Sequence, residues 1–304
     1  MVDVSRRKFV QKSLSMGLVA MVPAGLAGCG NSGSSQALAR SAASTSATDG
    51  PTLIALIDGK EVNRAEVLVW EARRLKVVAE RMQGNMPAAM LDNFRALFQR
   101  PLASTENIAL AREAMADAKM ALGSEKMKQL VSGDLMISDY AGALAATPKE
   151  WAVSEIEIYS NKGTAKGFTE WYGNAVAMND QRAMLRACPD HYVLESVGEN
   201  GQYVVEETGG AQVVTQFTID YTKPSNLPVA FDPMLVYKSV GPAINEQGVQ
   251  IGGVGHQFGE LETGFVSRLA VFFPATLPDW YVTEHRWHLA CEFSNWIEDY
   301  LSGV

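Results

Sequence analysis

The residue pattern of this chain changes near Trp151. Before this point, apolar residues recur at the three- and four-residue spacing of amphipathic helices. After it, short stretches alternate between apolar and polar residues, as half-buried strands do, until helical spacing returns at the end. Strands followed by one long closing helix favour a curved antiparallel sheet that grips this helix, with a cavity between them. We therefore expect an α+β fold, with a helical region over 51–150 and the sheet and closing helix over 151–304.

The helical region carries clear boundary signals. Asn63 is followed three residues later by Glu66, which is the spacing of a capping box, and Gly84 can end the same helix. Further helices are expected over 86–98, 104–123 and 125–130. In the second part, strands are expected over 156–159, 203–205, 213–221, 248–255 and 265–273, with a turn at Gly209-Gly210 and a closing helix from Trp280 or Tyr281 to Leu301.

The N-terminal segment has the pattern of an export signal. Ser5–Lys12 resembles the twin-arginine motif, and an apolar stretch over 16–28 follows it. Leu26-Ala27-Gly28-Cys29 resembles a lipobox, in which the cysteine becomes lipidated. We expect residues 1–28 to be a signal peptide and Cys29 to anchor the chain to a membrane, in the periplasm or at the cell surface. Residues 29–50, rich in Ser, Ala, Gly and Thr, are expected to form a flexible tether.

The overall composition limits the possible partners. The formal net charge is -8, which argues against nucleic acid as the main partner. Beyond the N-terminus, no apolar run is long enough to span a membrane. The composition does not fix an oligomeric state.

Two of the four histidines lie in the closing helix. His288 and Glu292 are four residues apart, so both side chains point the same way and can reach one metal ion. They lie about 100° around the helix from Leu289 and Phe293, which belong to its apolar face. The pair therefore flanks the buried face and can face the cavity. The alternative is a solvated pair on the surface.

Further polar residues precede this helix in a recognisable order. They are Trp171-Tyr172, Asp180-Gln181-Arg182, Cys188-Pro189-Asp190-His191, Glu206-Glu207, Gly255-His256 and Thr263–Arg268. Together with the closing pair, this order resembles the 2,4-diacetylphloroglucinol hydrolase family over residues 150–304. The resemblance implies a helix-grip fold, similar to plant pathogenesis-related and lipid-transfer domains.

The resemblance also implies a site and an activity. A zinc ion would be held by His191, Glu206 (or Glu207), His288 and Glu292. The reaction would be hydrolysis of a carbon–carbon bond in a small acylated phenol or a β-diketone-like molecule, and the strand residue His256 would donate or steer a proton. Alternation along the strand lets only one of the two glutamates face the cavity. We favour Glu206, which leaves the face of Tyr203 for packing.

The chain departs from the family pattern at two positions. Ala183 follows Arg182 where the family has a tyrosine, and Leu194 stands three residues after His191 where the family has an asparagine. These changes favour a different or more apolar ligand, and a non-catalytic lipoprotein that binds an apolar small molecule is the main alternative function. An export chaperone or structural lipoprotein is a third, suggested only by a short stretch near Ile54.

Other residues near these motifs leave alternatives open. Cys188 and Cys291 can bind the metal or form a disulfide, and their spacing does not decide between these. His285 lies three residues before His288 and can either support a metal ligand or face solvent, and we favour solvent. We expect Arg268 to be an ion-pair donor rather than a catalytic group.

Overall fold

The computed structural model describes residues 52–210, 213–223 and 226–303. The expected signal peptide, the lipidation site at Cys29 and the tether lie outside the described residues. Among the described residues, no helix is both long and apolar enough to cross a membrane.

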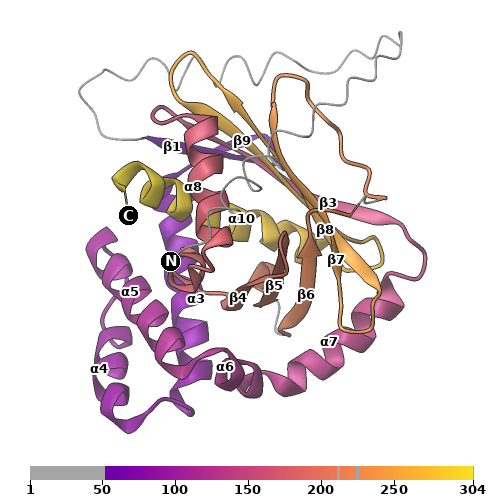
Figure 1. Ribbon diagram of the computed structural model, residues 1–304. Helices are drawn as coiled ribbons and strands as arrows, with labels where there is room; N and C mark the ends of the chain where they lie inside the picture. Colours follow the sequence, from indigo (N-terminus) through magenta and orange to yellow (C-terminus); the bar gives the residue numbers. More distant parts are fainter. Residues whose placement is uncertain (1–51, 211–212, 224–225, 304) are drawn as a thin grey trace, which may run out of the picture.

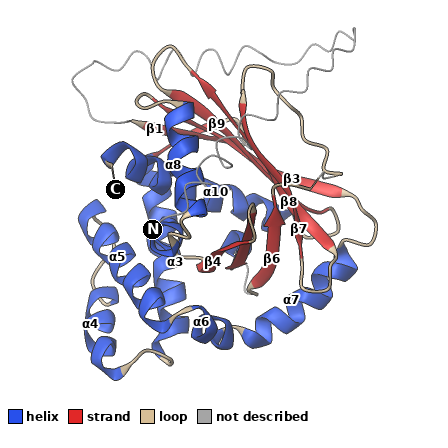
Figure 2. Cartoon of the chain, viewed as in Figure 1, coloured by secondary structure: helices blue, strands red, loops and turns tan. Residues whose placement is uncertain are grey.

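One curved antiparallel sheet of nine strands forms the framework of the described chain (Figures 1 and 2). Its strand order is β2-β1-β3-β9-β8-β7-β6-β5-β4. The strands are β1 (Leu53–Ile57), β2 (Lys60–Asn63), β3 (Trp151–Ser160), β4 (His191–Val197), β5 (Gly201–Glu206), β6 (Thr215–Asp220), β7 (Tyr237–Ile244), β8 (Gln250–Glu260) and β9 (Phe265–Pro274). The expected α+β class and the curved antiparallel sheet are therefore confirmed.

Eight α-helices accompany the sheet in the described residues. They are α3 (Arg64–Gln83), α4 (Ala88–Phe98), α5 (Thr105–Leu122), α6 (Ser124–Leu130), α7 (Ser132–Ala145), α8 (Ala165–Ala177), α9 (Gln181–Ala187) and α10 (Asp279–Ser302), with a short 3₁₀ turn, η1, at Thr208–Gly210. The first of these has the expected capping box, in which Asn63 and Glu66 bond reciprocally.

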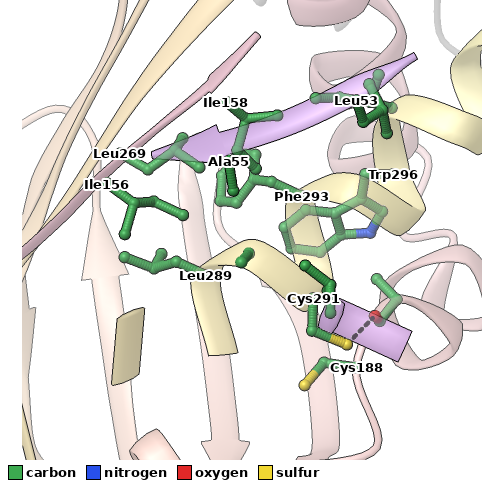
Figure 3. Packing of buried hydrophobic residues seen from close by; sticks show 14 of the residues in the cluster. Leu53, Ala55, Ile156, Ile158, Cys188, Leu269, Leu289, Cys291, Phe293 and Trp296 are labelled. Atoms are coloured by element: carbon green, nitrogen blue, oxygen red, sulfur yellow. Dashed lines mark hydrogen bonds between the residues drawn. The ribbon is translucent and has the colours of Figure 1, made fainter. Parts of the chain in front are cut away.

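The closing helix α10 lies against the concave side of the sheet (Figure 1). Its buried face includes Leu289, Phe293 and Trp296, which pack with apolar residues from β1, β3 and β9 (Figure 3). Leu289 has no solvent exposure, and the other two are 2% exposed. Removing a buried aromatic side chain of this kind typically costs about 3–5 kcal/mol. This packing fixes the rotation of α10, and with it the direction of His288 and Glu292.

A helical layer covers the other side of α10. Helix α3 contacts both α5 and α10, and α6 contacts β4. Arg112 of α5 donates from Nε and Nη2 to the buried carboxylate of Glu71 on α3. A second apolar cluster joins this layer to the outer face of β4 and β5, through Tyr192, Val193 and Val205.

The structure adds elements that the sequence pattern did not indicate. The region 51–150 is not wholly helical, because β1 and β2 join the sheet beside β3. Strands β4 and β7 and helices α7, α8 and α9 were not expected. The Gly209-Gly210 turn lies between the paired strands β5 and β6, as expected for a hairpin connection, but it takes the form of a 3₁₀ turn.

Candidate metal centre

Glu206, the last residue of β5, and Glu207, which follows it, point to opposite sides of the sheet. Gln202, Val204 and Glu206 line a pocket on the concave side. Glu207 faces the helical layer, where Tyr192 donates a hydrogen bond to it at 2.8 Å and Arg74 and Arg81 form ion pairs with it. Glu206 is therefore the glutamate that reaches the pocket, in the register that strand alternation predicts.

His191 begins β4 directly after a turn that the helical layer holds in place. The buried ammonium of Lys119 on α5 donates to the backbone carbonyls of both Pro189 and His191. The ring nitrogen Nδ1 of His191 lies 3.0 Å from the carbonyl oxygen of Met184, which can only accept a hydrogen bond. Nδ1 therefore carries the proton, and Nε2 is directed into the pocket with a free electron pair.

Four side chains from three elements converge at this point. Nε2 of His191 lies 3.2 Å from Nε2 of His288 and 3.1 Å from Oε2 of Glu292. Oε2 of Glu206 lies 3.8 Å from each of the two Nε2 atoms. Nε2 of His288 is also 3.8 Å from Oε2 of Glu292. The structure thus brings together the four residues that the sequence resemblance implied, from positions 191 to 292 of the chain.

These distances suit a cation with tetrahedral coordination. Zinc bonds nitrogen and oxygen at about 2.0–2.2 Å, which places neighbouring ligands of a tetrahedron about 3.3–3.6 Å apart. The observed separations of 3.1–3.8 Å bracket this range. Two imidazoles and two carboxylates are donors that zinc accepts, and they match its charge.

The protonation of the site also suits the binding of a cation. Burial raises the pKa of Glu206 to about 7, partly opposed by His191. Burial alone raises the pKa of Glu292 well above its ordinary value. Burial lowers the pKa of His191, and it lowers the pKa of His288 still further, with help from the neighbouring His191. The imidazoles are thus held in the neutral form that binds metals, and the carboxylates need a cation to ionise.

The other edge of the His288 ring faces a charged and a sulfur-bearing partner. Its Nδ1 lies 3.7 Å from Oδ2 of Asp190 and 3.8 Å from Sγ of Cys188. Asp190 accepts a hydrogen bond from Nε of Arg74 at 2.8 Å. A carboxylate behind a ligating histidine orients the ring and strengthens its electron pair.

Two alternative donor groups overlap the four-residue set. One combines Cys188 with His191 and His288, and the other combines Glu206 with His285 and His288, each with ligand atoms within 4.8 Å of one another. Cys188 lies on the Nδ1 side of His288, away from both carboxylates. The set made by the two Nε2 atoms and two carboxylates offers four donors rather than three, and five of its six pair separations are 3.1–3.8 Å.

The expectation that His285 faces solvent is wrong. It is 3% exposed and stacks on the ring of His288, with centroids 5.0 Å apart and planes 9° from parallel. Gly209 lets η1 approach α10 closely at this point. A Cβ atom at its positive φ would lie 2.8 Å from the Tyr281 carbonyl oxygen and 2.9 Å from the His285 backbone nitrogen. The position of His285, one turn before His288 on the same helix, is the sequence signal that places the two rings side by side.

The converging donors lie at one side of an apolar pocket with a volume of about 280 Å³. Its wall includes Phe217, Ile219, Val254 and Phe272 as well as the donor residues. His256 also lines it, and its Nδ1 has no hydrogen-bond partner among the described residues. Burial lowers the pKa of His256 to about 3, so its ring is neutral.

The positions that depart from the family pattern lie beside this pocket. Leu194 lines the wall and is buried, whereas the carbonyl oxygen of Ala183 accepts a hydrogen bond from Nε1 of Trp296. Hydroxyl groups come instead from Tyr172 and Tyr221, and the latter donates to Oε1 of Gln202 at 3.2 Å. Tyr172 belongs to the motifs of the resemblance and Tyr221 to an expected strand, but the sequence pattern assigns neither of them to the pocket.

The remaining motif residues have structural roles. Arg268 donates to Oε1 of Glu157 on the neighbouring strand β3, as expected of an ion-pair donor. Cys188 and Cys291 are buried free thiols, and Cys291 donates to the carbonyl oxygen of Ala187 (Figure 3).

Comparisons of the chain with protein-family models, with curated proteins and with solved structures give no match. The chemistry of the site therefore has to be inferred from its geometry and from the resemblance in residue order.

Proposed function

We propose that this protein is a zinc-dependent hydrolase with a helix-grip domain, of the 2,4-diacetylphloroglucinol hydrolase type. Its substrate class is a small acylated phenol or β-diketone-like molecule. The convergence of His191, Glu206, His288 and Glu292 beside an apolar pocket is the observation that carries this proposal. A bound zinc would act as a Lewis acid on a substrate oxygen.

The reaction consumes one water molecule. The bond between the acyl carbon and the activated carbon breaks, and the water oxygen becomes part of a carboxylic acid. The activated carbon receives a proton and leaves as the phenol or ketone. The water supplies this proton, and the neutral ring of His256, which faces the pocket, is the group that we assign to steering it from the water to the activated carbon.

The pocket wall complements such a substrate. Phe217 and Phe272 offer apolar contact for an aromatic ring or an acyl chain. The hydroxyls of Tyr172 and Tyr221 are placed to bind substrate oxygens, since both residues line the same pocket. Burial raises the pKa of both hydroxyls, so they remain protonated donors at neutral pH.

Elemental analysis of the purified chain tests the metal, and product analysis tests the reaction. We expect about one zinc per chain, and we expect a model acylphenol to yield a carboxylic acid and the deacylated phenol. Removing zinc with a chelator would abolish the activity, and adding zinc back would restore it. A fully active chain after complete zinc removal would overturn the proposal.

A second candidate is a lipoprotein that binds an apolar small molecule without chemistry. The replacement of polar family residues by Ala183 and by the pocket residue Leu194 favours it. It predicts that a ligand copurifies and stays bound after zinc is removed. It also predicts that no tested acylphenol or β-diketone is cleaved by the zinc-loaded chain.

We also propose that the protein is exported by the twin-arginine route and is anchored through a lipid on Cys29. The motif over Ser5–Lys12 and the lipobox that ends at Cys29 support this proposal. Mass spectrometry of the chain from membranes should show a lipidated N-terminal cysteine. Replacing Arg6 and Arg7 by lysine should retain the precursor inside the cell, and unchanged export would contradict the proposed route.

A further inference from the structure

The outer side of α7 is an apolar surface. It carries Met136, Ile137, Tyr140 and Leu144, which are 57–77% exposed. Residues at this spacing lie along one side of a helix. The charged residues of α7 are Asp134 and Asp139, and both are only partly exposed. We call these four side chains the α7 apolar face.

The two acidic residues of α7 are turned toward the body of the protein. Asp134 forms an ion pair with Arg81 of α3. Oδ2 of Asp139 accepts a hydrogen bond from Nε2 of Gln216 on β6 at 2.7 Å. The apolar face therefore results from a helix whose polar side is directed inward, which is the reverse of an ordinary surface helix.

The same helix forms part of the pocket wall. Ile137, Ser138, Ala141 and Gly142 line the pocket, and α7 lies beside β6 and β8 (Figure 1). Ile137 belongs to both surfaces. Within α7 only Leu135 and Ser138 are buried, so the helix is held on the sheet by little apolar packing and mainly by the polar contacts of Asp134 and Asp139. A pocket wall that buries so little apolar surface is a natural entrance to the pocket.

We propose that the α7 apolar face docks on a lipid bilayer, and that apolar substrates pass from the membrane beneath α7 into the pocket. The docking stands on the surface itself, whereas the entrance role rests on the proposed function. The substrate class is then narrowed to acylphenols or diketones that are apolar enough to partition into a bilayer.

The size and composition of the patch favour lipid over a second protein. A stable protein interface uses about 20–30 residues on each side, whereas this face offers four large side chains on one helix. An interfacial helix needs only to sink its apolar side about 5–10 Å into the headgroup region. Tyr140 has a ring suited to that boundary. Trp280, which is exposed at the start of α10, also has such a ring. The start of α10 lies near the end of α7, because the Thr276 hydroxyl just before α10 donates to the Ala145 carbonyl oxygen.

The anchor point allows this orientation. The described chain begins beside Leu53, which pairs with Ser160 at the far end of β3, whereas α7 leads into Trp151 at the near end. The ten residues of β3 span about 33 Å. The roughly 22 residues from 30 to 51 extend to at most about 75 Å. A chain anchored at Cys29 can therefore reach the membrane with α7 facing it.

Vesicle binding of the mature chain, from residue 29 onward and with Cys29→Ser, tests the docking without a lipid anchor or a signal peptide. Vesicles of phosphatidylcholine with a minor share of phosphatidylglycerol are sedimented with this chain and with the same chain carrying Tyr140→Glu and Leu144→Glu. We expect the binding of the double variant to be weaker by at least about ten-fold, because two apolar side chains are removed from the interface. Val69→Glu, at an exposed apolar position of α3, is the matched control and should bind normally.

Equal binding by the double variant and the control would overturn the proposal. A chain that forms dimers in buffer, and loses them with the α7 changes, would also overturn it in favour of a second copy as occupant. Zinc content and melting temperature establish that each variant is folded. Vesicle binding that depends on α7 in a chain without zinc or activity would leave the docking intact while refuting the proposed hydrolase, so the two failures are distinguishable.

Discussion

Nε2 of His191 lies 3.2 Å from Nε2 of His288, although 97 positions separate these residues. Two neutral imidazoles gain little from facing each other at this distance, since their electron pairs repel unless a proton or a cation lies between them. The two carboxylates within 3.1–3.8 Å supply the remaining donors of a cation site. The predictions below test this site and the residues that hold it.

The adjacent residues Glu206 and Glu207 give a matched pair for the metal. Glu206→Gln removes a charged donor, and we expect zinc affinity to fall by at least about ten-fold. Glu207→Gln leaves every proposed donor in place, and zinc should remain near one per chain. Zinc content after dialysis against a weak chelator measures both. A larger loss from the Glu207 variant would reverse the assignment.

The adjacent residues Arg74 and Arg73 offer a matched pair of substitutions that tests the stability of the fold. Arg74→Met leaves the buried carboxylates of Asp190 and Glu207 without their main cation, which typically costs about 3–5 kcal/mol. Arg73 lies mostly in solvent and pairs with Glu284, so Arg73→Met should cost about 0–1 kcal/mol. Urea unfolding of both variants measures the difference. Similar costs would show that the buried network contributes little.

Replacing His256 separates chemistry from metal binding. His256→Gln keeps a polar side chain in the pocket but removes the imidazole, so hydrolysis should slow by about 10²–10⁴-fold. Zinc content should stay unchanged, since His256 is not among the converging donors. Activity is followed by release of the carboxylic acid. Full activity of this variant would remove His256 from the mechanism.

The zinc-free chain should become less stable as the pH rises from about 6.5 to 8. In the lower part of this window the folded state retains a proton on Glu206, whose pKa is about 7, and burial also raises the pKa of Glu292 well above its ordinary value, whereas both carboxyls are ionised when unfolded. The folded state then binds more protons, so the free energy of unfolding falls with pH. The histidines, whose folded pKa values are lowered from 6.5, act in the opposite direction, and this effect offsets part of the loss near pH 6.5 and fades toward pH 8.

Zinc should cancel this loss, because bound carboxylates are ionised in the folded state as well. Melting temperatures of the zinc-free and zinc-loaded chains between pH 6.5 and 8 provide the comparison. A zinc-free chain that becomes more stable over this range would contradict the burial of two unpaired carboxyls.

Much of the site follows from patterns that are local in sequence. The spacing of His288 and Glu292 and the alternation around Glu206 fix which way these side chains point. The capping box at Asn63 likewise needs only its own residues. Such features depend on helix and strand geometry alone, and the structure agrees with the expected directions.

Other parts of the structure depend on contacts between distant segments. Nothing local shows that Leu53–Ile57 pairs with β3, or that Lys119 holds the turn before His191. Helix α7 could not be predicted from its pattern, because its large apolar residues face outward, whereas the apolar side of a surface helix normally faces the core. His285 was assigned to solvent because the close approach of η1 to α10 is visible only in three dimensions.

The donors come from the start of β4, the end of β5 and the middle of α10. The first two strands lie at one edge of the sheet, and the helix forms only after all nine strands have been synthesised. Until α10 is in place, a chain has at most half of the donors and cannot retain the ion. Uptake of the proposed zinc ion would thus mark the completion of folding. If the chain is exported in the folded state, as we propose, it would carry this ion only once assembly is finished.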